Sequence, residues 1–387
     1  MNDERLPFEL AEQSPHVRSV LAVDVAGIVS NWRKVASVAR GAHCAAVVKA
    51  NAYGTGPATV AALASAGCAT FFVASFEEAL AVASTGSVVY VLDGLLPGAD
   101  VSAFAATPPS VRPVLSSLEQ LRAWAEFAGS RPEARPAAVH VDTGMSRLGL
   151  PADEVAALAA QQSLCERLDV ALVMTHPASA DDPGSPQTRA QFEAFARLRQ
   201  QLPPWPASFA NSAAALSNVD HALDLVRPGI ALYGGRSLPR SEHGFTQVVS
   251  LFARVLQVRT IPAGTPVGYG ATAIVNRPSR IATLAVGYAD GYPRALSTEP
   301  QARAVTVRIC GHEAPIIGRI SMDLTTIDVT DLPGHVVAAG TWATVVGSHL
   351  TVDNIADRTG TIGYEILTGL APRSPRVVLA CPVSGGG

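Results

Sequence analysis

Short apolar runs alternate with amphipathic segments over the first two thirds of the chain. Segments such as "FEEALAVAST" (76–85) and "LEQLRAWAEFAG" (118–129) carry apolar residues at helical spacing. The apolar runs between them are continuous, which is typical of parallel strands buried on both faces. Strands alternating with helices over about 200 residues predict a (β/α)8 barrel of the TIM type. The eight runs are 44–49, 70–75, 88–93, 111–116, 137–142, 170–176, 206–211 and 229–234.

An open, doubly wound α/β sheet is the alternative architecture for this alternation of strands and helices. Such a sheet carries a glycine-rich dinucleotide fingerprint in the turn after its first strand. The only comparable turn in this chain, "AYGTG" (52–56), lacks the full fingerprint. The barrel is therefore the favoured prediction.

The pattern changes after residue 243. Val, Ile and Thr become frequent, and Gly and Pro interrupt the chain roughly every 8–12 residues, as in all-β domains. Segments such as "SLFARVLQVRTI" (250–261) are predicted strands separated by turns. We therefore predict an α/β protein with an N-terminal (β/α)8 barrel from 17 to 243 and a C-terminal mainly β domain from 244 to 387, with residues 1–16 as a candidate to pack on the latter.

Composition and charge exclude several classes of function. Of the 387 residues, 48% are hydrophobic and 16% are charged, which is typical of a globular protein. The net charge of -3 gives no reason to expect nucleic acid or an anionic membrane as a partner. No apolar run is long enough to span a membrane, and the acidic N-terminus does not resemble a signal peptide. The five scattered cysteines show no metal-binding spacing and indicate reduced thiols in a cytoplasmic compartment.

Candidate catalytic residues follow the predicted strands, since barrel enzymes place their active groups at the C-terminal ends of the strands. The first strand ends at Lys49, one of only two lysines among 29 basic residues. A lysine in this position can form a Schiff base with a carbonyl compound, and burial lowers the pKa of an amine toward the working range. The simpler interpretation of such a lysine is a solvated charge on the rim of the barrel.

The neighbouring motifs favour a catalytic lysine over a rim charge. Tyr53 lies in a glycine-flanked turn shortly after the lysine. The segment "ANSAAAL" (210–216) places Ser212 and free backbone N–H groups at a predicted helix start, which is typical of an anion site. "RPGIALYG" (227–234) supplies Gly229, where the backbone can approach a phosphate closely. A lysine facing a phosphate pocket is the arrangement that pyridoxal phosphate requires.

The lysine motif "VVKANAYGTG" (47–56) resembles that of the alanine racemases, which are fold-type III pyridoxal-phosphate enzymes. Further motifs follow in the order and approximate spacing of that family, and together they cover nearly the whole chain. Any one of them would be weak evidence, whereas the ordered set is specific. These motifs are "VDTGMSRLG" (141–149), "MTHPASAD" (174–181), "ANSAA" (210–214), "RPGIALYG" (227–234), "VGYGAT" (267–272), "AVGYADGYPR" (285–294), "GRISMD" (318–323) and "TIGYEIL" (361–367).

The resemblance implies a pyridoxal-phosphate-dependent racemase that interconverts L-alanine and D-alanine with two bases. Lys49 would hold the cofactor as a Schiff base and act as one base, and Tyr269 would be the second base on the opposite face of the substrate. Because the family's tyrosine comes from the partner subunit, a head-to-tail homodimer with shared active sites is also implied. The other implied residues are Tyr53, Ser212, Gly229 and Tyr364 at the cofactor phosphate, Arg227 at the pyridine nitrogen, Arg147 at the cofactor and the substrate carboxylate, His176 between Tyr269 and Arg227, and Met322 and Tyr288 at the substrate.

Some positions depart from the commonest family pattern. Thr55 stands where the lysine motif usually has histidine. His140 stands where many members have a lysine, carbamylated in some, that supports the active-site arginine, so we expect Arg147 to be held in another way. Pro177 replaces a bulkier apolar residue and Ser321 replaces cysteine near the expected substrate pocket. These changes leave alanine the favoured substrate and keep a broader or shifted range open.

Alanine racemisation, which supplies D-alanine for peptidoglycan or interconverts it in catabolism, is therefore the first functional hypothesis. A broad-specificity or serine racemase of the same fold is the alternative. A fold-type III decarboxylase is less favoured, because "VGYGAT" and "GRISMD" match the second half of the racemases. A non-enzymatic carrier of pyridoxal phosphate would not need the β domain that contains Tyr269.

Overall fold

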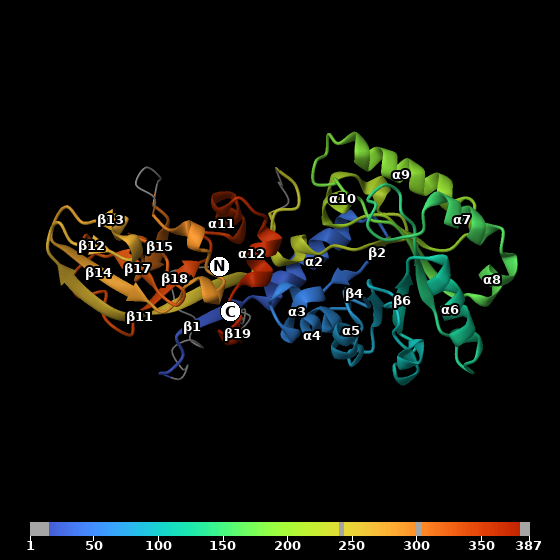
Figure 1. The fold of residues 1–387 in the computed structure, drawn as a ribbon, viewed down its shortest axis with the longest axis horizontal. Helices are drawn as coiled ribbons and strands as arrows, with labels where there is room; N and C mark the ends of the chain where they lie inside the picture. The colour runs from blue at the N-terminus through green and yellow to red at the C-terminus, as the bar shows by residue number, and fades with distance from the viewer. Residues whose placement is uncertain (1–14, 240–243, 299–303, 380–387) are drawn as a thin grey trace, which may run out of the picture. The chain divides into compact units, whose positions relative to one another are not determined.

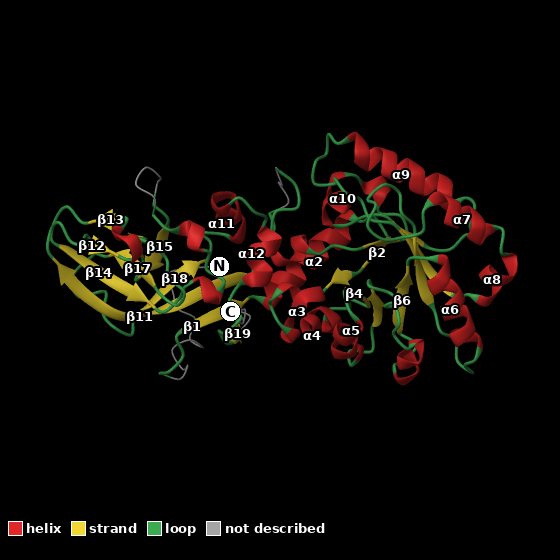
Figure 2. Cartoon of the chain, in the orientation of Figure 1, coloured by secondary structure: helices red, strands yellow, loops and turns green. Residues whose placement is uncertain are grey.

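The computed structural model describes residues 15–239, 244–298 and 304–379, and Figures 1 and 2 show their helices and strands. The sequence suggests that residues 1–16 pack on the β domain, but nearly all of these residues lie outside the described ranges. Within those ranges, no helix is both long and apolar enough to cross a membrane.

The chain divides into two compact units. The β unit includes residues 17–27, which the sequence-based boundary assigns to the barrel, and it also includes the short segment 54–56 from the lysine motif. Among the described residues, the barrel unit consists of 28–53, 57–239 and 244–246, and the β unit consists of 15–27, 54–56, 247–298 and 304–379.

A ring of short parallel strands forms the centre of the barrel unit (Figure 1). Its strands are β2 (His43–Cys44), β3 (Ala46–Val47), β4 (Thr70–Val73), β5 (Val88–Val91), β6 (Val111–Leu115), β7 (Ala137–His140), β8 (Val170–Met174), β9 (Ala207–Ser208) and β10 (Leu225–Val226). Strands β3 to β9 pair in chain order, and β10 pairs with β2. The N–H of Arg227 donates to the carbonyl of Ala210 at 2.9 Å, which joins the last two strands. The predicted (β/α)8 barrel is therefore confirmed.

Side chains fill the interior of this ring. The aromatic rings of Phe72 and Tyr90 stack there with centroids 4.9 Å apart. A TIM barrel is a packed core and not a pore, so its reactive groups are confined to its ends. The buried members of this cluster are Ala45, Phe72, Tyr90, Val114, Ala138, Leu172, Met174 and Leu225.

The eighth barrel strand lies earlier in the chain than the sequence predicts. The predicted strand is the apolar run 229–234, but the strand is β10, and Ile230–Tyr233 form the 3₁₀ helix η3. The prediction is wrong because a short apolar run between glycines is compatible with a buried helical turn as well as with a buried strand. Arg227 and Gly229 therefore follow the last strand, at its C-terminal end, and do not lead into it.

Helices connect the barrel strands, and the amphipathic segments predicted at 76–85 and 118–129 are confirmed as α5 and α6. Both begin at a serine whose hydroxyl accepts a backbone N–H in the first turn, which satisfies a donor that the helix leaves unpaired. The helices are α2 (Val25–Val38), α4 (Pro57–Ser65), α5 (Phe76–Ala83), η1 (Val101–Ala106), α6 (Leu118–Gly129), α7 (Ala152–Ala159), α8 (Gln162–Arg167), α9 (Pro186–Arg199), α10 (Ser212–Ser217) and η2 (Val219–His221).

The β unit is built on the long strand β11 (Val249–Ile261), which pairs antiparallel with three other strands. Its strands are β1 (Ser19–Val23), β11, β12 (Pro266–Val267), β13 (Ala273–Ile274), β14 (Ser279–Leu284), β15 (Thr306–Ile309), β16 (His312–Pro315), β17 (Thr325–Asp328), β18 (Trp342–Val346) and β19 (Arg376–Val378). Its helices are η4 (Tyr269–Ala271), η5 (Tyr288–Asp290), η6 (Arg294–Leu296), α11 (Val352–Thr359) and α12 (Gly363–Gly369).

Candidate active site

Lys49 lies directly after the first barrel strands, at the start of a turn of left-handed helix, α3 (Lys49–Tyr53). Ala50, Asn51, Ala52 and Tyr53 all have φ angles of 53–54°. For residues other than glycine this conformation costs roughly 1–2 kcal/mol each, so the chain concentrates backbone strain beside the lysine. Strain of this kind persists only where the surrounding structure holds it in place.

The carboxylate of Glu78 on α5 stabilises this strained turn. One oxygen accepts the N–H of Ala50 at 2.6 Å, and the other accepts the N–H of Ala74 after β4 at 2.8 Å. The side chain thereby ties the lysine turn to the end of the neighbouring strand. Sequence reasoning does not identify Glu78, because the pattern of Ser75 followed three residues later by glutamate predicts a local capping box.

Tyr53, Ser212 and Gly229 come together at the same end of the barrel. A Cβ added at Gly229 would lie only 2.3 Å from the Tyr53 hydroxyl, so the tyrosine packs directly against the glycine backbone. The Ser212 hydroxyl accepts the N–H of Gly229 at 2.8 Å. The ring of Tyr53 stacks on that of Tyr233 with centroids 4.4 Å apart. The hydroxyls of Tyr53 and Ser212 therefore lie together against the backbone of Gly229. Any side chain larger than hydrogen at position 229 would collide with the tyrosine.

The guanidinium of Arg227 is buried at the C-terminal end of β10, and its side chain is only 4% exposed. It donates to the carbonyls of Thr175 at 2.6 Å and Phe209 at 3.3 Å, and also to the hydroxyl of Ser208. Burial lowers the pKa of Arg227 to about 9, so the group remains charged at neutral pH. The barrel therefore holds a fixed positive charge close to its active end.

Two histidines near this charge are held neutral. Burial, reinforced by the charges of Arg227 and Arg147, lowers the pKa of His176 to about 3. Burial and the charge of Arg227 also lower the pKa of His140 to about 4. Both imidazoles are therefore uncharged at neutral pH, where each can donate through one ring nitrogen and accept through the other.

Replacing His140 with glutamine is expected to weaken the acid sensitivity of the fold. Below a pH of 6.5 the unfolded chain gains a proton at His140, whereas the folded chain gains it only near pH 4. The free energy of unfolding therefore falls by up to about 1.4 kcal/mol per pH unit over this window, and the contribution is fully present only above it. Glutamine does not titrate, so the free energy of unfolding of His140→Gln should fall less steeply as the pH is lowered.

Urea unfolding at several pH values measures how steeply the free energy of unfolding changes with pH. The matched control is His312→Gln, which changes an exposed histidine in β16 and should keep the wild-type slope. An unchanged slope in His140→Gln would contradict the burial of a neutral imidazole at this position.

Arg147 is exposed on the loop that follows β7, and Asp142 shapes that loop. One carboxylate oxygen of Asp142 accepts the N–H groups of Gly144, Met145 and Ser146 at 2.9, 3.0 and 3.2 Å. Burial alone would raise the pKa of Asp142, but these N–H groups outweigh it and lower the pKa. These hydrogen bonds to Asp142 hold the shape of the loop, on which Arg147 is exposed.

Gln191 on α9 ties the loops of Arg147 and His176 together. Its side chain is only 1% exposed. The amide donates to the carbonyl of His176 at 3.1 Å and to Thr143 at 3.5 Å, and it accepts the N–H of Ala178 at 2.8 Å. Sequence reasoning does not identify this residue, because a glutamine in an amphipathic helix is usually solvated.

The β unit gathers Tyr269, Tyr288 and Met322 around Ser321. The N–H of Tyr288 donates to the Ser321 carbonyl at 3.1 Å, and the next N–H donates to the Met322 carbonyl at 2.9 Å. Tyr269 and Ser321 line one cavity of about 390 Å³. Tyr269 is 72% exposed, and Tyr288, Met322 and Tyr364 on α12 are also exposed. Exposed large apolar side chains in a group usually mark a surface that binds something.

The positions that depart from the family pattern are mostly enclosed. Thr55 is buried, and the carbonyl of the preceding Gly54 accepts from Arg376 at 2.6 Å within the β unit. Pro177 is buried after β8. The hydroxyl of Ser321 donates to the carbonyl of Leu324 at 2.9 Å and stabilises the turn that carries Met322.

A (β/α)8 barrel that carries a lysine and a buried arginine at the ends of its strands has the architecture of a barrel enzyme. The family description "Alanine racemase, N-terminal domain" matches residues 23–237, and "Alanine racemase, C-terminal domain" matches residues 248–378. The chain therefore belongs to the alanine racemase family.

Individual relatives agree with this assignment. The chain is 46% identical over 369 residues to an alanine racemase of Methylobacterium sp. (strain 4-46), covering 95% of this chain and 99% of the relative. It is 42% identical to a catabolic alanine racemase of Rhizobium johnstonii, covering 92% of this chain and 93% of the relative. The crystal structure of alanine racemase from Bartonella henselae with covalently bound pyridoxal phosphate superposes with a TM-score of 0.85 at 38% identity, covering 93% of this chain and 99% of that one.

These comparisons confirm the family, the fold class, the racemase activity and the cofactor that the sequence predicts.

Proposed function

We propose that the chain interconverts L-alanine and D-alanine with Lys49 and Tyr269 as bases on opposite faces of the substrate. The position of Lys49 at a strand end, in the same unit as a charged arginine and a neutral histidine, supports this most directly. When bound, pyridoxal phosphate holds the substrate amine covalently and withdraws electrons from Cα, which makes the Cα proton acidic. Each base then removes or returns that proton on its own side, so both directions are served.

Three residues of the barrel unit suit the cofactor phosphate. Tyr53 and Ser212 bring hydroxyl groups to the backbone of Gly229, and a side chain at that glycine would fill the space against the tyrosine. Hydroxyl groups and backbone N–H groups are the usual ligands of a phosphate. We assign the phosphate to these three residues, and the resemblance to the family implies Tyr364 as a further contact.

Charged and polar groups would orient the rest of the cofactor and the substrate. A guanidinium such as Arg227 donates a hydrogen bond to the pyridine nitrogen without transferring its proton, because its pKa stays above the working pH. The neutral His176 can accept from one neighbour and donate to another, which suits a link between Tyr269 and the arginine. We assign Arg147 to the cofactor's phenolic oxygen and the substrate carboxylate, where its charge-assisted hydrogen bonds orient Cα.

Substituting alanine for Gly229 is expected to weaken cofactor binding at least tenfold. The new Cβ would lie 2.3 Å from the Tyr53 hydroxyl, so the phosphate wall must open. A titration of the visible absorbance of the bound cofactor measures the dissociation constant. The matched control is Gly129→Ala at the end of α6, where an added Cβ meets no atom within 4 Å, and its affinity should be unchanged. Wild-type affinity in Gly229→Ala would argue against this phosphate site.

We also propose a head-to-tail homodimer in which Tyr269 acts in the active site of the partner. The exposure of Tyr269, Tyr288 and Met322 supports this, since large apolar groups at an interface are exposed in the single chain. Met322, through its backbone N–H, would meet the substrate carboxylate, and Tyr288 would line the entrance to the site.

Mixing two inactive variants tests this arrangement. In a dimer with shared sites, Lys49→Ala and Tyr269→Ala each inactivate both sites, but a mixed dimer retains one intact site. Random reassembly makes about half of the dimers mixed, so about a quarter of the wild-type activity should return. Dissociation in mild denaturant, remixing and assay of L-alanine racemisation give the measurement. If no activity returns although mixed dimers are present, the shared site is wrong.

A cytoplasmic location is part of the proposal. Four cysteines within the described residues are free thiols: Cys44, Cys68, Cys165 and Cys310. Burial raises the pKa of the Cys44 and Cys68 thiols, which keeps both unreactive. Reduced, inert thiols suit a reducing compartment. Cys381 lies outside the described ranges.

A further inference from the structure

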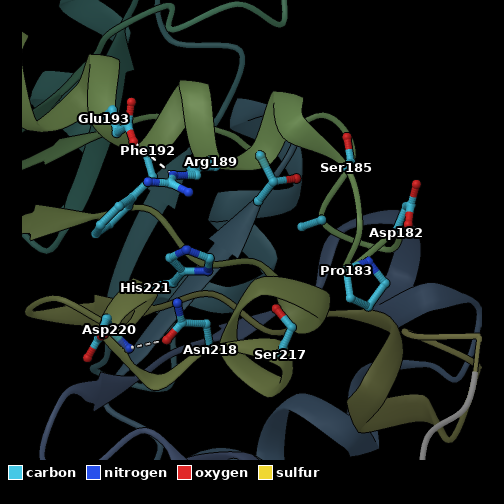
Figure 3. A pocket seen from close by; sticks show the side chains of 12 residues that line it. Asp182, Pro183, Ser185, Arg189, Phe192, Glu193, Ser217, Asn218, Asp220 and His221 are labelled. Carbon is cyan, nitrogen blue, oxygen red and sulfur yellow. Dashed lines mark hydrogen bonds and ion pairs between the residues drawn. The ribbon is translucent and has the colours of Figure 1, made fainter.

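A second cavity of about 640 Å³ lies in the barrel unit, between the first half of α9 and the segment that follows α10 (Figure 3). Its volume is typical of small-molecule sites, which span roughly 300–1,000 Å³. None of the residues that line it belongs to the cofactor or substrate set proposed above. Gln191 of α9 supports the active-site loops, whereas Thr188, Phe192 and Glu193 of the same helix face this cavity.

Two buried polar atoms at the cavity have no hydrogen-bond partner among the described residues. One is the hydroxyl of Thr188, a residue only 8% exposed, and the other is Nδ1 of His221. A buried polar atom left unpaired costs about 1–3 kcal/mol, which a ligand that supplies the missing hydrogen bond would recover. Their convergence on one cavity indicates that a ligand completes their hydrogen bonds.

The chemistry of His221 indicates what that ligand must offer. Burial lowers the pKa of His221, so the ring is neutral at neutral pH. Nδ1 has no partner among the described residues, so the neutral ring can carry its proton on Nε2. In that tautomer Nδ1 is an acceptor, and it requires a donor from the ligand. The ring is held in place between Phe192 and Phe209, with centroids 4.8 and 5.1 Å away.

The rim of the cavity favours a cation. Three carboxylates, those of Asp182, Glu193 and Asp220, line it against a single guanidinium, Arg189, which leaves a net of two negative charges. Arg189 is already paired with Glu193 at 3.0 Å, as Figure 3 shows. The N-terminus of α9 contributes only about half a positive charge, so it does not reverse the sign.

We propose that this cavity binds a small molecule with an ammonium group, whose N–H donates to Nδ1 of His221 while a second polar group pairs with the Thr188 hydroxyl. The rim carboxylates of Asp182 and Asp220 attract the positive charge. Such a ligand is distinct from the alanine substrate, which must reach the lysine at the end of the first strand.

Binding of diethanolamine to the cofactor-loaded protein tests the site. This secondary amine carries one ammonium and two hydroxyls, and it cannot form the imine that a primary amine would form with the cofactor. Iminodiacetate is the matched probe, because it keeps the secondary amine and replaces the hydroxyls with carboxylates. Calorimetry should show saturable binding of diethanolamine and binding of iminodiacetate at least tenfold weaker. Equal binding of both probes, or no binding of diethanolamine, would overturn the proposal.

Variants locate the binding within the protein. Thr188→Val removes the unpaired hydroxyl at nearly constant shape, and His221→Phe removes Nδ1 together with Nε2. Each variant should weaken diethanolamine binding at least tenfold. Asp220→Asn removes an exposed rim charge and should weaken diethanolamine binding. Arg197→Gln, which alters an exposed arginine in the last turn of α9 outside the cavity, should bind as the wild type does. Unchanged affinity in all three cavity variants would show that the amine binds elsewhere.

Discussion

Replacing Lys49 with alanine is expected to lower alanine racemisation by about 10⁴-fold or more, because one residue serves as both the cofactor's covalent anchor and a catalytic base. The visible absorbance of the bound cofactor should be lost together with the activity. No other side chain can take over, since a guanidinium stays protonated and does not form an imine. Circular dichroism of L-alanine solutions and absorbance of the cofactor-supplied protein measure the two effects.

Lys34→Ala is the matched control for this variant, since Lys34 is the only other lysine in the chain. It lies on α2, and its ammonium donates to the carbonyl of Gly244 at 2.5 Å. The control should keep both the absorbance and the wild-type rate. A Lys49→Ala variant that retains the absorbance and a rate within tenfold of wild type would eliminate Lys49 as the anchor.

The Tyr269→Phe variant is expected to separate proton exchange from inversion. Racemisation should fall by roughly 10²–10⁴-fold, the contribution of one general base. The lysine can still remove and return the proton on its own face, so one enantiomer of alanine should exchange its Cα proton in D2O while keeping its configuration. The other enantiomer, whose Cα proton faces the missing hydroxyl, should exchange slowly. Proton NMR and chiral chromatography of the same samples measure exchange and inversion.

The ratio of the two exchange rates is the informative quantity. Because the enantiomers are equally stable, overall racemisation must slow equally in both directions, so steady-state rates alone cannot identify the face on which Tyr269 acts. Tyr292→Phe is the matched control, since its buried hydroxyl has no hydrogen-bond partner within the described chain. Tyr292→Phe should exchange the Cα proton of both enantiomers of alanine as fast as the wild type does. Small and equal changes for both enantiomers in Tyr269→Phe would refute the two-base assignment.

The barrel could be predicted from the sequence because its strands are buried on both faces and therefore read as continuous apolar runs. The same property explains the one misplaced strand. Ile230–Tyr233 are all buried, and burial on every side removes the periodicity that distinguishes a strand from a helical turn. The error matters for the site, because Arg227 and Gly229 follow β10 and therefore lie at the end of the barrel where the active groups gather.

The residues that hold the site in shape were beyond the reach of local patterns. Glu78 has the spacing of a helix capping residue, yet its carboxylate binds the N–H groups of Ala50 and Ala74 on two separate loops. Gln191 lies in an amphipathic helix with exposed neighbours, yet it is buried between two loops. Such contacts join segments that are distant along the chain, and neither helical spacing nor residue type encodes them.

By itself, the sequence determined which chemical groups this protein possesses and in what order they occur. An imine-forming lysine at a strand end, a tyrosine between glycines and the ordered motifs were sufficient to identify the family. Only the tertiary structure decided the state of those groups. Desolvation and the charge of Arg227, which depend on packing between distant segments, make His140 and His176 neutral. Packing also strains the backbone after Lys49 and leaves the Thr188 hydroxyl and Nδ1 of His221 without hydrogen-bond partners at a second cavity. Burial is a property of the folded chain and not of any one segment.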